Sequence, residues 1–350
     1  MLIPSLLIVA GLAALVLGGE SVVRGAIGIC RRFGVSRLVV GLLVVAFGTS
    51  VPELAVNLTA SLQGQGELCY GNIIGSNIAN IGLILGAAAL VRPLAIASIV
   101  VRREIPMLAM VSVAAAALGF DRFMSAAAAD HFSRGDAVVL LLLFSAFLYY
   151  TVMEVVRGKR VDSALATGPN GERAGARDGA SGAAAGDRVD GVPSTAAPPP
   201  IWKAAGLTLL GFVLLTAGGK LTVDGAVDLA QLFGVSEALI GLTIVAIGTS
   251  LPELVTALTA VRHGEVNMAV GNVIGSNLFN LLFVLGISSL IQPVPIPAGT
   301  GSSLLMMLFL TLLLWPMILT NQRRVVRWEG ALLLLLYFAH IAYQSLPVLR

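Results

Sequence analysis

Two glutamates, Glu53 and Glu253, each lie in the middle of a long apolar stretch of the chain. Each ends the same short sequence, Gly-Thr-Ser-Val/Leu-Pro-Glu. An ionised carboxylate at the centre of a bilayer costs about 2.5–3.5 kcal/mol even on a lenient insertion scale, and two carboxylates that faced each other would also repel. A bound divalent cation or a proton would relieve both costs, so the pair predicts a cation site within a membrane.

Further oxygen atoms share the helix faces of the two glutamates. Thr49 and Ser50 lie four and three residues before Glu53, which places the three side chains on one face of a helix. Pro52 removes a backbone N–H and clashes with the preceding turn, so that carbonyl oxygens around Ala46 become available to a cation. In lipid, such a break is tolerated only where it is buried in protein or lines a wet cavity.

A second segment adds Ser76 and Asn80, which also lie four residues apart on one helix face, and every one of these residues recurs 200 positions later. Carboxylate, hydroxyl, amide and main-chain oxygens without clustered Cys or His suit hard cations such as Ca²⁺ or Na⁺, and suit Zn²⁺ or Cu⁺ poorly. The predicted ion ligands are Ala46, Thr49, Ser50, Glu53, Ser76, Asn80, Ala246, Thr249, Ser250, Glu253, Ser276 and Asn280.

The composition places most of the chain in lipid. Of the 350 residues, 57% are hydrophobic and 12% are charged, and the mean hydropathy is +0.92. Soluble domains carry about 25% charged residues, so this chain has too little polar surface to cover a water-soluble globule. Membrane topology accounts for the net charge of +3, which gives no reason to expect nucleic acid as a partner.

The chain contains an internal duplication. Residues 41–86 align with residues 241–286 without gaps, and 23 of the 46 positions are identical. The shared segments include GTSxPEL and GNxIGSNxxN, which random apolar helices would not share. Each half holds five apolar runs, and an odd number sends the second half into the membrane from the opposite side. The halves are therefore predicted to be inverted repeats, with a substrate site near the bilayer midplane.

We predict an all-α integral membrane fold of ten transmembrane helices in two inverted five-helix repeats. The expected helices cover residues 5–30, 36–62, 68–90, 104–119, 135–156, 203–231, 236–261, 267–290, 302–320 and 328–346. The first repeat is expected to comprise residues 1–156 and the second residues 202–350. Residues 157–201, which are rich in Ala, Gly, Asp, Arg and Pro, are expected to form a low-complexity linker.

Basic residues orient this bundle. The loops after helices 1, 3, 5, 7 and 9 contain 17 Lys and Arg residues, whereas the opposite side has only Arg122, Arg134 and Arg350. The positive-inside rule places the first group, and with it the central linker, in the cytoplasm. Both termini are then expected outside the cytoplasm, and the expected location is the inner (plasma) membrane.

The paired GTSxPE and GNxxGSNxxN segments resemble the α-repeats of the Ca²⁺:cation antiporter superfamily, in particular its prokaryotic Na⁺/Ca²⁺ exchanger branch. The resemblance covers nearly the whole chain apart from the central linker. It implies an exchanger-like fold in which the twelve residues named above coordinate ions. It also implies that Glu53 and Glu253 are shared by Ca²⁺ and Na⁺, which bind alternately while the protein exchanges them across the membrane.

Two features bear on the choice of counter-ion. The H⁺/Ca²⁺ branch of the superfamily tends to carry Gly-Asn-x-x-Glu at the glutamate motif, which this chain lacks. Some relatives, including K⁺-dependent exchangers, have aspartate where this chain has Asn80 or Asn280, which weakens the case for K⁺ cotransport. An H⁺-driven antiporter of the same fold remains the alternative, because a carboxylate can trade a proton for a cation.

Other classes of protein receive less support. The chain has no His-Glu-x-x-His, no Gly-x-Ser-x-Gly and no paired intramembrane aspartates, so it is not expected to be an enzyme. A channel would be distinguished by single-channel currents far above carrier turnover. The expected partners are the transported Ca²⁺ and Na⁺ and the lipid bilayer, with no cofactor and no required protein partner.

The remaining polar residues are given structural roles. Asn72 and Asn272 are expected to cap the starts of helices 3 and 8. The i,i+4 spacing predicts two salt bridges near the membrane edge or between helices, Glu20–Arg24 and Lys220–Asp224. Solvated or packing roles are expected for three isolated histidines, His131, His263 and His340.

Overall fold

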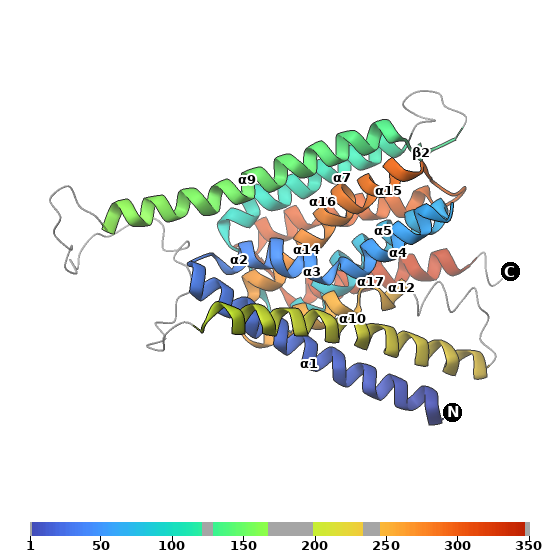
Figure 1. Ribbon diagram of the computed structural model, residues 1–350. Coiled ribbons are helices and arrows are strands. Elements are labelled where there is room, and N and C mark those ends of the chain that lie inside the picture. The colour runs from blue at the N-terminus through green and yellow to red at the C-terminus, as the bar shows by residue number, and fades with distance from the viewer. Residues whose placement is uncertain (1, 121–128, 167–198, 234–245, 347–350) are drawn as a thin grey trace.

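Helices provide nearly all the regular structure of the chain, and most of them run along a common direction (Figure 1). The structure is a computed structural model, and it describes residues 2–120, 129–166, 199–233 and 246–346. The described part contains only four strands, of two residues each. The first helix begins and the last helix ends at the same end of the bundle, as an even number of spans requires.

The first half of the chain consists of α1 (Leu2–Phe33), α2 (Arg37–Val40), η1 (Gly41–Val45), α3 (Ala46–Thr49), α4 (Val51–Leu62), α5 (Gly66–Ala79), η2 (Asn80–Leu85), α6 (Gly86–Val91), β1 (Leu94–Ala95), η3 (Val100–Glu104), α7 (Ile105–Gly119), β2 (His131–Phe132) and α9 (Arg134–Ala166). The η elements are π-helical turns.

The second half consists of α10 (Ile201–Leu232), α12 (Ala246–Gly248), α13 (Leu251–Arg262), α14 (Val266–Leu278), η5 (Phe279–Val284), α15 (Leu285–Ile291), β3 (Val294–Pro295), α16 (Gly301–Thr320), β4 (Arg324–Val325) and α17 (Arg327–Ser345). The π-helical turns η2 and η5 occupy almost equivalent positions in the two repeats.

The prediction of an all-helical membrane fold is confirmed. Six described helices are individually long and apolar enough to cross a bilayer, and residues 37–49 and 51–62, bent by 44°, together make a seventh span. The other three expected spans correspond to η3 with α7, to α12 with α13, and to α17. Residues 236–245, the first part of the expected seventh helix, lie outside the described residues.

Helix α9 is longer than expected. It continues through Ala166, so residues 157–166, which were assigned to the low-complexity linker, are helical. The prediction ended this helix where its apolar run ends, at residue 156, which is too early. A helix can continue beyond the apolar run as a polar segment without losing its backbone hydrogen bonds. Residues 167–198 of the expected linker lie outside the described residues.

The first helices of the two repeats, α1 and α10, pack against each other along most of their lengths and run antiparallel. A Cβ atom added to a glycine of one helix would meet the backbone of the other at four levels, spaced seven residues apart. The pairs are Pro4–Gly225, Gly11–Gly218, Gly18–Gly211 and Gly25–Ala204. Equivalent helices that run in opposite directions are what inverted repeats require.

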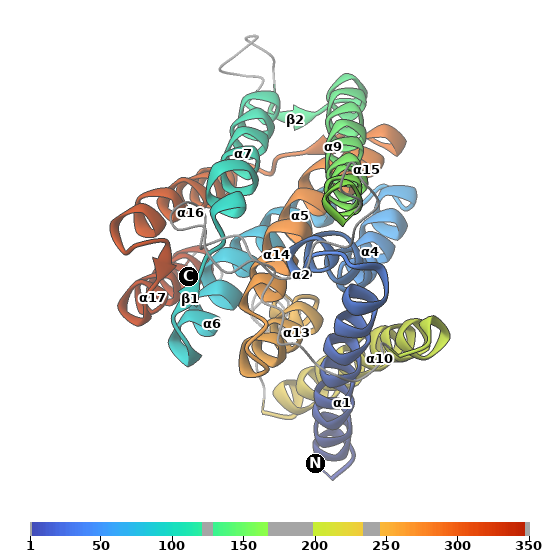
Figure 2. The ribbon, with the colours of Figure 1, turned by 90° about the vertical axis from the view of Figure 1, so that its left-hand side faces the viewer.

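The helices in the middle of the bundle are those that carry the GNxIGSNxxN segments (Figure 2). The 18-residue windows within residues 66–91 and 266–291 are 78% buried inside the protein, against 28% for α1 and α10. Two short antiparallel ladders tie loops of the two repeats together: β1 pairs with β4, and β2 pairs with β3. The central helices are therefore held at both ends by the opposite repeat.

The expected charged pairs behave differently in the two repeats. Arg24 Nε donates to Glu20 at 2.6 Å, as predicted. The prediction for Lys220 and Asp224 is wrong, since no ion pair within 4 Å joins these two exposed described residues. Surface i,i+4 pairs are worth only about 0.3–0.5 kcal/mol, so the spacing permits a pair without requiring one. His263, at the end of α13, is not isolated, because its Nε2 lies 2.8 Å from Glu20 in α1.

The close packing of α1 and α10 predicts the effect of a single methyl group. In Gly11→Ala, the new Cβ would lie 2.6 Å from the backbone nitrogen of Thr222 and 2.7 Å from the carbonyl oxygen of Gly218, so the helices must move apart. We expect a loss of about 1–3 kcal/mol in stability, measured as earlier thermal unfolding in detergent by fluorescence-detected gel filtration. The control is Gly206→Ala in α10, where nothing lies within 4 Å. Equal unfolding temperatures for the two variants would contradict this packing.

Candidate cation site

Each GTSxPE segment breaks its helix at the serine. Helix α3 ends at Thr49 and α4 begins at Val51, with Ser50 between them at φ −89°, ψ 5°. Pro52 lies in the first turn of α4, where its missing N–H is tolerated. Ser250, before α13, has nearly the same conformation, φ −90° and ψ 4°. The two breaks thus place the same oxygen-bearing residues at the ends of short helices in both repeats.

The two glutamates lie next to this pair of breaks. Glu53 and Glu253 are both 1% exposed. The hydroxyl of Ser50 donates to Oε1 of Glu253 at 3.2 Å, which joins the first repeat to the second. No Lys or Arg of the described residues forms an ion pair with either glutamate. The structure therefore brings two like charges together without a cationic side chain.

The central helices contribute the predicted serines and asparagines. Ser76 and Asn80 lie where α5 meets η2, and Ser276 and Asn280 lie where α14 meets η5. All four are buried. The Nδ2 of Asn280 donates to Oγ of Ser76 at 3.1 Å, so this pair too crosses between the repeats. A π-helical turn at this point widens the helix and turns its side chains, as is often seen at functional sites.

Several buried oxygens in this region have no hydrogen-bond partner among the described residues. An unpaired buried acceptor costs about 1–3 kcal/mol, so a cluster of them is costly unless something else binds there. A hard cation would satisfy them, because every one can act as an oxygen ligand. The atoms are Oε2 of Glu53 and of Glu253, Oδ1 of Asn80 and of Asn280, and Oγ of Ser250 and of Ser276.

The carbonyl of Ala46 in the first repeat differs from the expectation. The carbonyl of Ala46 is not released, since it accepts the N–H of Ser50 at 3.0 Å and the hydroxyl of Thr49 at 3.3 Å. The helix breaks after α3, and the hydrogen bonds of α3 are kept, because Pro52 falls within the first turn of the next helix. In the second repeat the N–H of Ser250 bonds to the carbonyl of Ile247, at 3.1 Å. The two threonines differ as well: Thr49 is buried, whereas Thr249 is half-buried.

The prediction that Asn72 and Asn272 cap helices is wrong. The residues at the two cap positions are Gln65 and Glu265, and both asparagines lie well inside α5 and α14. Asn272 is fully buried, and its Oδ1 accepts from the hydroxyl of Thr49 at 3.3 Å. The local rule failed because the tight turn before each helix sets the helix start several residues earlier.

Sequence reasoning also missed Asn57 and Asn277. Asn277 is buried, and its Oδ1 accepts from Nδ2 of Asn80 at 2.9 Å. It belongs to the repeated GNxIGSNxxN segment, so the duplication carried a signal for it. Asn57 is fully buried and donates to the carbonyl of Glu53 at 2.7 Å. Its equivalent in the second repeat is Ala257, so no repeat signal could have found it.

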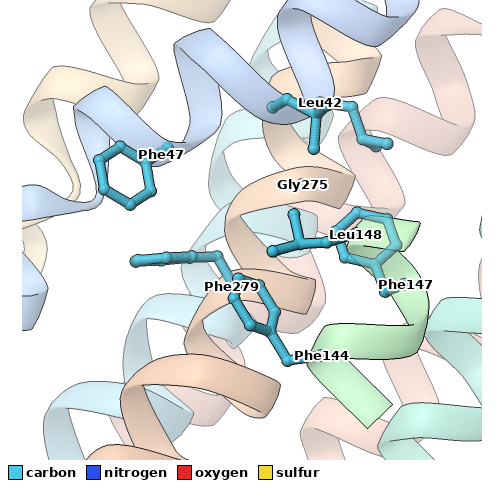
Figure 3. Close-up of a pocket in the computed structure, with 8 residues that line it drawn as sticks. Leu42, Phe47, Phe144, Phe147, Leu148, Gly275 and Phe279 are labelled. Atoms are coloured by element: carbon cyan, nitrogen blue, oxygen red, sulfur yellow. The ribbon is translucent and has the colours of Figure 1, made fainter. Parts of the chain in front are cut away.

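A cluster of aromatic side chains lies next to the predicted ion ligands. Leu42, Phe47, Phe144 and Phe279 are among the residues that line a small apolar pocket between η1, α3, α9, α14 and η5 (Figure 3). The Phe279 ring is 5.1 Å from that of Phe47 and 5.9 Å from that of Phe144, centroid to centroid. The pocket has no polar side chain, so it is not the ion site. Three of its lining residues, Phe47, Gly275 and Phe279, are the sequence neighbours of Ala46, Ser276 and Asn280.

Comparison with known proteins agrees with this geometry. Residues 3–153 and 203–346 match the family model described as sodium/calcium exchanger protein. The chain belongs to the sodium/calcium exchanger family. It is 38% identical to the inner membrane protein YrbG of Escherichia coli over 84% of this chain and 81% of that protein. It is 33% identical to the sodium/calcium exchanger MaX1 of Methanosarcina acetivorans, over 96% of this chain and 97% of that protein.

The structure resembles that of a solved exchanger as well. It superimposes on the sodium-calcium exchanger NCX_Mj with a TM-score of 0.77, at 31% identity, over 98% of this chain and 99% of that chain. This exchanger-family chain is accordingly a multi-pass membrane protein and a cation antiporter of the exchanger type, not an enzyme. The resemblance to the prokaryotic Na⁺/Ca²⁺ exchanger branch, and the exchanger-like fold that it implied, are thus confirmed.

The unrelieved charge in the exchanger's centre predicts an unusual effect of neutralisation. Glu53→Gln or Glu253→Gln removes a buried carboxylate that costs about 2.5–3.5 kcal/mol at this depth. We expect each variant to unfold several degrees later than the wild type in cation-free detergent solution at alkaline pH. We also expect added Ca²⁺ to raise the unfolding temperature of the wild type but not that of either variant. Differential scanning fluorimetry with and without Ca²⁺ measures both effects.

The matched control is Glu20→Gln, because Glu20 is partly exposed and bonded to Arg24 and His263. That change should bring no gain in stability and should leave the Ca²⁺ effect intact. Destabilisation of the cation-free protein by Glu53→Gln would mean that an unseen partner already neutralises the carboxylate.

Proposed function

We propose that this protein exchanges Ca²⁺ for Na⁺ across the membrane by alternating access, with Glu53 and Glu253 as ligands that both ions share. The observation that carries the proposal is the cluster of buried oxygens around two carboxylates that have no cationic side chain among the described residues. Two negative charges and neutral oxygens match one Ca²⁺, or Na⁺ ions that replace it.

The shared carboxylates would account for obligatory exchange. A site that closed without a cation would hold two facing carboxylates in a low-dielectric interior, which is strongly unfavourable. The protein therefore changes access readily only when a cation fills the site. Support comes also from NCX_Mj, whose structures were obtained after soaking with Na⁺ and Ca²⁺, and from MaX1, which is named a sodium/calcium exchanger.

The remaining ten residues are proposed to complete the coordination. They are Ala46, Thr49, Ser50, Ser76, Asn80, Ala246, Thr249, Ser250, Ser276 and Asn280. The main-chain oxygen of Ala46 would have to release its two hydrogen bonds to contact an ion, so we assign it a part only in some steps of the cycle. The side-chain oxygens of the asparagines are already unpaired in the described part of the chain.

We place the protein in the inner membrane, with both termini outside the cytoplasm. The 17 basic residues on one side and three on the other support this orientation, and YrbG is named an inner membrane protein. The repeats would comprise residues 1–156 and 202–350, joined by a cytoplasmic linker whose start is helical through Ala166.

The test is Ca²⁺ uptake into proteoliposomes. Vesicles loaded with Na⁺ and diluted into Na⁺-free medium should take up Ca²⁺, and removal of the Na⁺ gradient should stop the uptake. Glu53→Gln and Glu253→Gln should each reduce uptake to background, because one negative charge and one ligand are lost. Glu67→Gln, an exposed glutamate in the first turn of α5, is the control that should transport normally.

Two results would contradict the assignment. Unimpaired flux in both glutamine variants would show that the site is not at these residues. Uptake that ignores the Na⁺ gradient but follows a pH gradient would identify the counter-ion as H⁺ instead, with the same residues exchanging a proton for Ca²⁺.

A further inference from the structure

Asn77 and Asn277 follow the two site serines, and neither belongs to the proposed set of ion ligands. Both are buried, with exposures of 0% and 1%. The Nδ2 of Asn77 donates to the carbonyl of Ile73 in its own helix at 2.7 Å. The Oδ1 of Asn277 instead accepts from Asn80 in the other repeat. Two residues with the same place in the repeat therefore make different bonds.

The two site asparagines differ in a related way. Asn80 donates from Nδ2 to Asn277 at 2.9 Å, whereas Asn280 donates from Nδ2 to the hydroxyl of Ser76 at 3.1 Å. In both cases the partner accepts a hydrogen bond from Nδ2, whereas Oδ1 has no partner among the described residues. Only the oxygen of an amide can contact a cation. The bond to the nitrogen therefore selects the orientation that a cation site needs.

Two buried acceptors that are unpaired in this arrangement would be used if the two repeats exchanged their conformations. Exchange of the two repeats would pair Asn280 with Asn77, and Asn80 with Ser276. Within the described part of the chain, Oδ1 of Asn77 and Oγ of Ser276 are both buried and have no hydrogen-bond partner. In alternating access one repeat moves against the other around a fixed site, so an acceptor that is unpaired in one state can be occupied in the other.

We propose that Asn77 and Asn277 are positioning residues that work in turn, an inference that rests on the proposed alternating-access function. In the state described, Asn277 holds Asn80 and Ser76 holds Asn280. In the state open to the other face, Asn77 holds Asn280 and Ser276 holds Asn80. Both amide oxygens stay directed at the ion throughout. The serine that is free for the ion changes from Ser276 to Ser76, so the ligand set changes with access.

The first test uses the sidedness of Ca²⁺ affinity. Leucine is close to asparagine in size and cannot accept a hydrogen bond, so Asn277→Leu leaves Asn80 free to turn its N–H groups toward the cation. Loss of a residue that orients a metal ligand lowers affinity by about 10–100-fold. We expect the KM for Ca²⁺ to rise by about tenfold or more on one membrane face in Asn277→Leu, and on the opposite face in Asn77→Leu. Right-side-out and inside-out vesicles give the two values.

The second test separates positioning from a merely structural role. In Asn80→Asp the side chain has two oxygens, so it presents an oxygen to the cation in either orientation. A bond to Asn277 is then not needed to orient it. Adding Asn277→Leu to Asn80→Asp should then raise the KM little beyond that of Asn80→Asp alone. A structural role would give the same further loss in both backgrounds, as a double-mutant cycle measures.

Equal increases in KM on both faces for both leucine variants, or additive effects in the cycle, would overturn the alternation. Calorimetric titration of Ca²⁺ into the purified protein in detergent separates this inference from the proposed function. A wild type that binds Ca²⁺ without exchanging it would overturn the exchange alone, and the variants' affinities would still report positioning. A wild type that binds no Ca²⁺ would overturn both.

Discussion

Repulsion between two buried glutamates is the interaction on which the rest of this structure depends. Glu53 and Glu253 come from opposite repeats and are both buried in the interior, where water does not screen them. Among the described residues no basic side chain neutralises them. A bound cation or a proton would relieve this cost. Under the proposed function, the affinity for the ion and the instability of the empty site therefore have one origin.

The fold supplies what this pair of charges needs. The helix breaks at Ser50 and Ser250 bring hydroxyl groups beside the carboxylates. The π-helical turns η2 and η5 begin at or next to the site asparagines, and the central helices that carry them are the most buried of the spans. The rings of Phe47 and Phe144 both pack against that of Phe279, the sequence neighbour of Asn280. Hydrogen bonds between the repeats join the predicted site residues of the two halves.

The fold and the faces of the site could be predicted from the sequence because both depend on regular spacing. Apolar runs predict spans, and the constant offset of 200 residues pairs Glu53 with Glu253. The bonds from Asn80 to Asn277 and from Thr49 to Asn272 could not be predicted, since they join residues that only tertiary packing brings together. The capping of helices by Asn72 and Asn272 and the Lys220–Asp224 pair were wrong for the converse reason. Local sequence rules show which interactions a residue can make, whereas packing against neighbouring elements determines which of them form.

The seven-residue spacing of the contacts between α1 and α10 has a mechanical consequence. Pro4, Gly11, Gly18 and Gly25 face Gly225, Gly218, Gly211 and Ala204 in turn. Seven residues of helix span about 10.5 Å, so shifting one helix along the other by that length restores the fit between small residues over most of the interface. Smaller shifts would press side chains against backbone. The small residues therefore define well-packed registers of this interface that are separated by about 10.5 Å.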